Sequence, residues 1–155
     1  MTYTSEIRIN LKLEAFANKL INTENLKHWQ LGLADYDHIY GTPGKTGSKT
    51  RLHYTLDKKQ FFLIQTISKS ELPHKLHITY ESNGLYTIQK NYFKAISDSE
   101  ILWTSKNEIM PTNFRMRMML LIMPSTFKNQ TKTYLEDFKN FAENAVSVNN
   151  KSLKK

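Results

Sequence analysis

Residues 124–148 read PSTFKNQTKTYLEDFKNFAENAVSV, and this stretch decides the fold. Its apolar side chains recur every three or four positions, which places them on one face of an α-helix. They are Phe127, Tyr134, Leu135, Phe138, Phe141, Ala142, Ala145 and Val148. Lys132, Glu136 and Lys139 repeat with the same period on another face. The sequence therefore predicts a helix of about six turns whose apolar stripe needs a broad apolar surface to cover it.

The chain before this helix is mostly predicted as strand. Residues 3–11 alternate between apolar and polar side chains, residues 13–21 and 23–29 change to helical spacing, and residues 31–40 are again extended. Five more strands are predicted, at residues 50–56, 60–67, 75–82, 85–96 and 100–110. Asn83-Gly84 between two of them is a strong hairpin signal. Connections this short join antiparallel neighbours, so the sequence predicts an antiparallel meander.

Length and composition indicate one soluble domain. A chain of 155 residues with 39% hydrophobic content can bury a sizeable core. We expect a single domain at residues 1–148 and a basic, disordered tail at residues 149–155. The absence of cysteine excludes disulfides, and no apolar run approaches the roughly 20 residues that span a bilayer. The beginning of the chain lacks a signal-peptide pattern, so the expected location is cytoplasmic, with no stable membrane insertion.

The net charge of +8 is a weak guide to partners. Three of the positive charges, those of Lys151, Lys154 and Lys155, lie in the tail, and the other basic residues are scattered. A dispersed surplus of this kind favours solubility over a dedicated anion-binding face. We therefore expect no nucleic-acid partner and a monomer or homodimer, with transient contact with anionic lipid as a minor alternative to plain solubility.

Several short motifs occur in an order that resembles a known superfamily. They are Trp29, Gly41-x-x-Gly44-x-x-Gly47-Ser48, Thr66-Ile67 before Leu72-Pro73, Tyr80-Glu81, Asn91-x-Phe93, Thr104, Pro124-x-x-Phe127 and Phe138-Lys139-x-Phe141-Ala142-Glu143. The set resembles the small bacterial members of the START/polyketide-cyclase superfamily, also called SRPBCC. That resemblance implies an α+β helix-grip fold: a curved antiparallel sheet of about seven strands (β-α-α-β6-α) wrapped around the long C-terminal helix. It also implies a cavity for lipid- or polyketide-like ligands, and it carries no shared catalytic residue.

The residues themselves offer little for other chemistry. Gly44-Lys45-Thr46 lacks the glycine that a phosphate-binding loop needs at position 39 and precedes a strand instead of a helix. His74 and His77 are three residues apart, which on a strand puts them on opposite faces. We therefore expect no metal, no cofactor and no assigned catalytic residue.

The predicted site is an apolar pocket between the sheet and the C-terminal helix. Strand phase directs five residues towards it: Leu52, Tyr54, Ile64, Ile78 and Tyr80. From the helix, Phe127, Tyr134 and Phe138 face them. Asn91 and Trp103 are the candidate polar anchors, because buried amide and indole groups need hydrogen-bond partners. Met116 and Met119, in a Met-rich helix predicted at residues 114–123, would either fill core space or form a pliable wall or lid over the cavity.

Three functions fit this pattern. The first is binding of a small hydrophobic or amphipathic ligand. The second is a cyclase or hydrolase reaction in the same cavity, with Tyr54, His53 or Asn91 polarising a carbonyl. The third is a co-chaperone-activator-like interaction module that uses the outer sheet face and the basic surface, which an exposed apolar patch on that face would favour.

Overall fold

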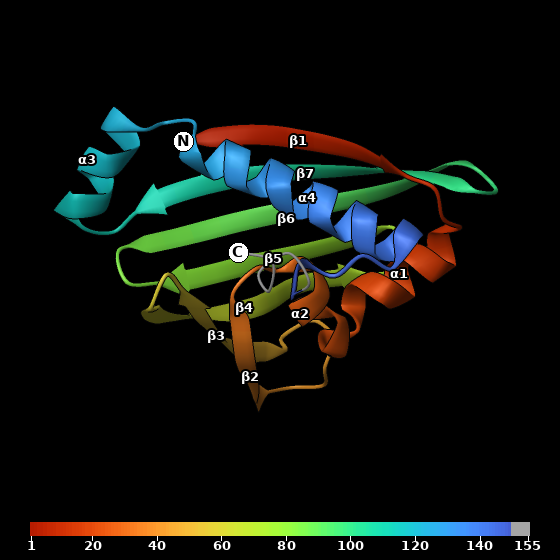
Figure 1. The fold of residues 1–155 in the computed structure, drawn as a ribbon, viewed down its shortest axis with the longest axis horizontal. Helices are drawn as coiled ribbons and strands as arrows, with labels where there is room; N and C mark the ends of the chain where they lie inside the picture. Colours follow the sequence, from red (N-terminus) through yellow and green to blue (C-terminus); the bar gives the residue numbers. More distant parts are fainter. Residues whose placement is uncertain (150–155) are drawn as a thin grey trace.

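The computed structural model describes residues 1–149, so most of the predicted tail at residues 149–155 lies outside the described residues. Seven strands and the helices around them follow one another along the chain (Figure 1). They are β1 (Thr2–Ile9), α1 (Leu13–Ile21), a 3-10 turn (Thr23–Asn25), α2 (Leu26–Trp29), β2 (Leu33–Tyr40), β3 (Lys49–Leu56), β4 (Lys59–Glu71), β5 (Lys75–Ser82), β6 (Leu85–Ser97), β7 (Glu100–Pro111), α3 (Phe114–Ile122) and α4 (Thr126–Asn144).

The strands form one antiparallel sheet in the order β1-β7-β6-β5-β4-β3-β2. Consecutive strands from β2 to β7 are neighbours, and β1 closes the far edge against β7. The predicted seven-stranded α+β meander is therefore confirmed. Strand β5 has the predicted bounds, whereas β4 continues four residues past the predicted Ile67, through an irregular register between Ile67 and Lys69.

Helix α4 lies across the inner face of the sheet (Figure 1). Of its buried side chains, Leu135, Phe138 and Ala142 belong to the predicted stripe, whereas the polar Thr131 and Asp137 do not. The predicted C-terminal bound at residue 148 is wrong. The helix ends at Asn144 because Ala145 takes a left-handed conformation (φ 55°), and its N–H donates to the Phe141 carbonyl at 2.9 Å. Val148 is buried nonetheless, after the break.

Five aromatic rings hold the layers together: Phe16, Trp29, Phe93, Trp103 and Phe138. We call them the aromatic cluster. They come from α1, α2, β6, β7 and α4, and their contacts are edge-to-face at centroid distances between 4.9 and 5.8 Å. This is the preferred geometry for buried aromatic pairs. The cluster thus fixes the position of α4 and of the two short N-terminal helices over one half of the sheet.

Helix α3 packs differently from the other helices. It begins where the side chain of Asn113 accepts a hydrogen bond from the Met116 N–H at 2.9 Å, which caps the first turn. None of its residues is buried, and in Figure 1 it projects beyond the end of β7. Among the described residues, no helix is both long and apolar enough to cross a bilayer.

Candidate functional site

A cavity of about 180 Å³ lies between the inner sheet face and the first half of α4. Its lining is aromatic and aliphatic with several uncharged polar groups. The lining residues are Tyr3, Trp29, Gln30, Tyr54, Phe61, Leu63, Tyr80, Ser82, Leu85, Thr87, Gln89, Trp103, Asn107, Ile109, Phe127, Gln130, Thr131, Tyr134 and Leu135. Among these described residues there is no Asp, Glu, Lys, Arg or His. We call this space the outer lobe, because its rim includes the half-exposed Phe61.

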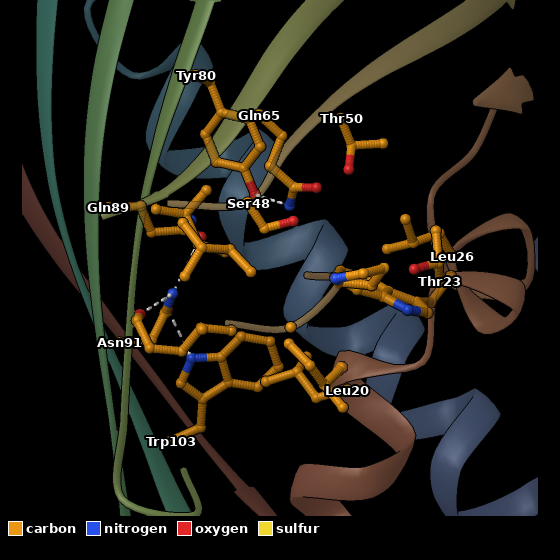
Figure 2. A pocket seen from close by; sticks show the side chains of 17 residues that line it. Leu20, Thr23, Leu26, Ser48, Thr50, Gln65, Tyr80, Gln89, Asn91 and Trp103 are labelled. Atoms are coloured by element: carbon orange, nitrogen blue, oxygen red, sulfur yellow. Dashed lines mark hydrogen bonds between the residues drawn. The ribbon is translucent and has the colours of Figure 1, made fainter. Parts of the chain in front are cut away.

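A second space of about 60 Å³ lies between the sheet and the helices α1 and α2, and we call it the inner lobe. Figure 2 shows Tyr80, Gln89, Asn91 and Trp103 on the sheet side and Leu20 and Leu26 on the helix side. Trp29, Tyr80, Gln89 and Trp103 line both lobes, so the two lobes meet at these four side chains.

A chain of side-chain hydrogen bonds runs along the inner face of β6 and β7. The Trp103 indole N–H donates to Asn91 Oδ1 at 2.9 Å, and Asn91 Nδ2 donates to the Leu76 carbonyl at 3.1 Å and to Gln89 Oε1 at 3.2 Å (Figure 2). Gln89 Nε2 then donates to Asn107 Oδ1 at 3.2 Å. Because buried polar groups are costly unless paired, this network fixes the side chains that form the cavity floor.

The four tyrosines of the outer lobe are neutral groups at physiological pH. Burial raises the pKa of Tyr3, Tyr54, Tyr80 and Tyr134, and it raises that of Tyr80 to about 12. Tyr54 donates to Gln30 Oε1 at 2.5 Å. Tyr80 accepts a hydrogen bond from Gln65 at 3.4 Å, and Tyr134 accepts one from Gln130 at 3.5 Å, so their own hydroxyl hydrogens remain available to a ligand.

The raised pKa of Tyr80 predicts a specific loss of stability at alkaline pH. Below about pH 10, Tyr80 is protonated in both the folded and the unfolded state, so its full stabilising contribution is present. Between pH 10 and about 12 the unfolded chain loses this proton while the folded protein keeps it. The free energy of unfolding should therefore fall, by about 1.4 kcal/mol from this residue by pH 11.

Urea unfolding of wild type and Tyr80→Phe, near neutral pH and at about pH 11, measures this contribution of Tyr80 to the free energy of unfolding. The fall in unfolding free energy should be smaller in the variant by roughly 1 kcal/mol. An equal fall in both proteins would show that the Tyr80 hydroxyl titrates normally.

Trp29 carries the most informative polar group of the site. Its side chain is only 7% exposed, and its Nε1 has no hydrogen-bond partner among the described residues. A buried donor without an acceptor costs about 1–3 kcal/mol. An acceptor atom delivered by a ligand at the junction of the two lobes would recover this cost.

The structure brings seven of the predicted site residues to the two lobes: Tyr54, Ile78, Tyr80, Asn91, Trp103, Phe127 and Tyr134. Asn91 and Trp103, predicted as polar anchors for a ligand, are hydrogen-bonded to each other instead. Both of Asn91's side-chain polar atoms are already engaged, however, and it is 1% exposed, so it supports the wall and does not face open space.

The other five predicted site residues lie elsewhere. Leu52 and Phe138 are fully buried core residues, which sequence phase cannot distinguish from cavity lining. Ile64 is on the outer face, because Leu52 pairs with Leu63 and Arg51 pairs with Ile64. Met116 and Met119 are half-buried in α3 and line neither lobe, so the wall or lid role predicted for them is not seen.

Sequence reasoning missed several polar groups of the site, among them Gln30, Gln65, Thr87, Gln89 and Asn107. A signal was present for two of them. Thr87 and Gln89 share the phase of the apolar Leu85 and of the predicted anchor Asn91, so one strand face already carried all four residues.

Three further predictions concern the surroundings of the cavity. His53 lies on the outer face of β3, and its Nε2 is 2.8 Å from the Asp37 carboxylate oxygen Oδ2. Residues 41–48 contribute Pro43, Gly44 and the buried Ser48 to the wall of the inner lobe. Strand β3 follows this loop directly, whereas a phosphate-binding loop would be followed by a helix. Within residues 1–149, no group of three or more His, Asp or Glu side chains is arranged to hold a metal ion.

Comparison with known proteins identifies the fold. No protein-family model matches the sequence, and no curated protein matches it. Solved structures do match over nearly the whole chain. One is a protein from Thermus thermophilus (10% identity, 95% of this chain and 100% of that chain, TM-score 0.71).

Two other solved structures match over a similar share of the chain. Ara h 8.0201 shares 8% identity over 92% of this chain and 97% of its own, with a TM-score of 0.70. The AHSA1-like protein from Aeromonas hydrophila shares 15% identity over 94% of both chains, with a TM-score of 0.67. Together these neighbours confirm the START/SRPBCC-type helix-grip fold that the sequence motifs indicated.

Proposed function

We propose that this helix-grip chain binds a small, uncharged, amphipathic ligand in the cavity between the sheet and α4. The orphaned Trp29 indole N–H carries the proposal, because Trp29 lines both lobes and this N–H is buried without an acceptor among the described residues. The ligand that best fits has an apolar ring or chain and at least one hydrogen-bond acceptor, such as a carbonyl or hydroxyl oxygen.

The size and charge of the cavity narrow the ligand class. The outer lobe holds about 180 Å³, and a cavity of about 150 Å³ accommodates one benzene ring. A ligand of one or two rings, or the end of a lipid-like chain, fits this space. A charged ligand would find no oppositely charged partner among the described lining residues, and burying an unpaired charge is costly.

The alternative of a cyclase or hydrolase has less support in the geometry. His53 is on the outer face, and Asn91 is committed to three hydrogen bonds. Tyr54 remains, but its raised pKa makes it a neutral donor and a poor base at neutral pH. An exposed apolar patch on the outer sheet face would favour the third hypothesis, whereas the three most exposed apolar side chains, Phe114, Leu121 and Ile122, lie on α3.

The proposal is tested by native mass spectrometry of the purified protein, with identification of any released molecule, followed by titration with that molecule or with a panel of ring-bearing ligands. Trp29→Phe keeps an aromatic ring but removes the N–H donor. We expect this variant to bind carbonyl-bearing ligands about 5- to 20-fold more weakly, and to bind their hydrocarbon analogues as wild type does.

A matched tryptophan control is Trp103→Phe, because the Trp103 N–H is already satisfied by Asn91. It should reduce stability without separating carbonyl-bearing ligands from hydrocarbon ones. Empty protein in the spectrometer, together with no thermal shift for any ligand of the panel, would overturn the proposal.

A further inference from the structure

Helix α3 exposes a concentration of large apolar side chains. Phe114 is 77% exposed, Leu121 76% and Ile122 72%, and Met123 directly after the helix is 55% exposed. Single exposed apolar residues are ordinary, but a contiguous group on one short helix marks an interaction surface. We call Phe114, Leu121, Ile122 and Met123 the α3 patch.

The sequence around the α3 patch is basic. Between Glu108 and Glu136 there is no acidic residue, whereas Arg115 and Arg117 lie in the first turns of α3 and Lys128 and Lys132 in α4. The basic side chains come first in α3, and the uninterrupted apolar run 118–123 comes last. This division suits a segment whose apolar end enters a lipid surface while its basic end remains at the headgroups.

We propose that the α3 patch docks the protein on an anionic lipid surface. A lipid surface supplies an apolar interior and negative headgroups, and each basic residue near such a surface contributes favourably to binding. A second copy of this chain is a poorer occupant, because it would bring Arg115 and Arg117 against another positively charged helix of the same sequence. The helix is too short to span a bilayer, so the contact is peripheral.

The chain segments on both sides of α3 contribute residues to the outer lobe. Ile109, just before α3, and Phe127, just after it, both line that lobe. The Thr112 N–H donates to the Gly84 carbonyl at 2.8 Å, which ties the start of α3 to the β5–β6 hairpin beside the lining residue Leu85. Figure 1 shows α3 and this hairpin at the same end of the molecule.

The β3–β4 hairpin extends the same rim. Phe61, which is 45% exposed, lines the outer lobe, and Lys58 and Lys59 precede it, with Asp57 as the acidic residue of the turn. Docking through α3 would therefore bring the cavity mouth to the lipid surface, where an amphipathic ligand could pass without crossing water. This last step rests on the proposed function, whereas the docking itself does not.

Vesicle flotation tests the docking. The probes are vesicles of phosphatidylcholine alone and vesicles with about 30% phosphatidylglycerol, at low salt and at about 0.5 M salt. We expect wild type to float with the anionic vesicles at low salt only. Leu121→Ser/Ile122→Ser should bind at least tenfold more weakly, and Arg115→Gln/Arg117→Gln about 10- to 30-fold more weakly.

Matched controls make comparable apolar-to-serine and basic-to-glutamine changes away from α3. Ile39→Ser/Ile96→Ser removes two isoleucines that are 46% and 44% exposed, and Lys90→Gln/Lys94→Gln removes two exposed charges from β6. Both should bind anionic vesicles within about twofold of wild type. Each variant's thermal unfolding confirms that it is folded.

Two results would overturn the proposal. The first is that wild type does not bind anionic vesicles at low salt. If wild type is then a dimer by sedimentation and Leu121→Ser/Ile122→Ser is a monomer, the α3 patch is an interface between two copies of the chain. The other is flotation that the α3 variants leave unchanged. Because flotation needs no cavity ligand, failure of the cavity proposal would leave this result intact.

Discussion

Replacing Phe138 with alanine is expected to lower the free energy of unfolding by about 3–5 kcal/mol. Phe138 is fully buried in α4, and its ring meets Phe16, Trp29 and Trp103 edge-to-face at 5.4, 5.3 and 5.5 Å. Truncation leaves a cavity where α4 contacts both N-terminal helices and the sheet. Urea unfolding followed by far-UV circular dichroism measures the loss.

Phe141→Ala is the matched control, because it makes the same substitution one helical turn further along α4. Phe141 is only partly buried, and it stacks on His28 at a centroid distance of 5.1 Å. Its loss should cost about 1–2 kcal/mol. If Phe138→Ala does not fold, Phe138→Leu should still unfold about 1–2 kcal/mol more easily than wild type. Equal costs at positions 138 and 141 would contradict the central role of the aromatic cluster.

Replacing Thr87 with phenylalanine is expected to weaken ligand binding by more than about tenfold. Thr87 lines the outer lobe from β6, between its strand partners Tyr80 and Ile109, which also line it. A phenyl ring at this position occupies the space that a ring-sized ligand needs. Isothermal titration with any ligand identified by mass spectrometry, or with the best ligand of the panel, measures the effect.

Stability should separate this effect from unfolding. Filling an existing cavity with apolar atoms should leave the free energy of unfolding within about 1 kcal/mol of wild type. Thr79→Phe is the matched control, because Thr79 precedes Tyr80 on β5 and therefore points to the opposite face of the sheet. Wild-type affinity in Thr87→Phe would place the ligand outside the outer lobe.

Local pattern was sufficient for the elements and their order. Extended patterns between turn signals identified all seven strands, and the Asn83-Gly84 pair identified the β5–β6 hairpin, where Gly84 has the positive φ of 86° that such turns require. The apolar period of α4 was read correctly up to Phe141 and Ala142. The predicted C-terminal end of the helix was wrong, because the helix ends before Ala145 and the sequence has no glycine or proline there that would indicate an end.

Cavity and core could not be told apart in the same way. Leu52 and Tyr54 follow one another on the inner face of β3, yet Leu52 is enclosed by neighbours while Tyr54 lines the outer lobe. Whether an inward side chain meets another side chain or open space depends on how closely α4 approaches the sheet at that point. That distance is set by residues distant in sequence, the aromatic cluster among them.

Register was the second property beyond the reach of pattern. The β3–β4 pairing joins even-numbered residues to odd-numbered ones, so Ile64 faces outwards although strand phase predicted that it faces the helix. A shift of one residue reverses every side chain of a strand, and the turn at Asp57 and Lys58, both with positive φ, helps to fix the register.

The amino-acid sequence by itself thus determined the α+β class, the seven strands and the long C-terminal helix with its apolar stripe. These follow from local spacing, which acts over a few residues. Tertiary structure alone decided that the Trp29 indole would be buried without an acceptor among the described residues, that Gln89 would join Asn91 to Asn107, and that α3 would lie uncovered. These features depend on which side chains, distant in sequence, fill the space around a given group. The spacing of residues along the chain does not specify that.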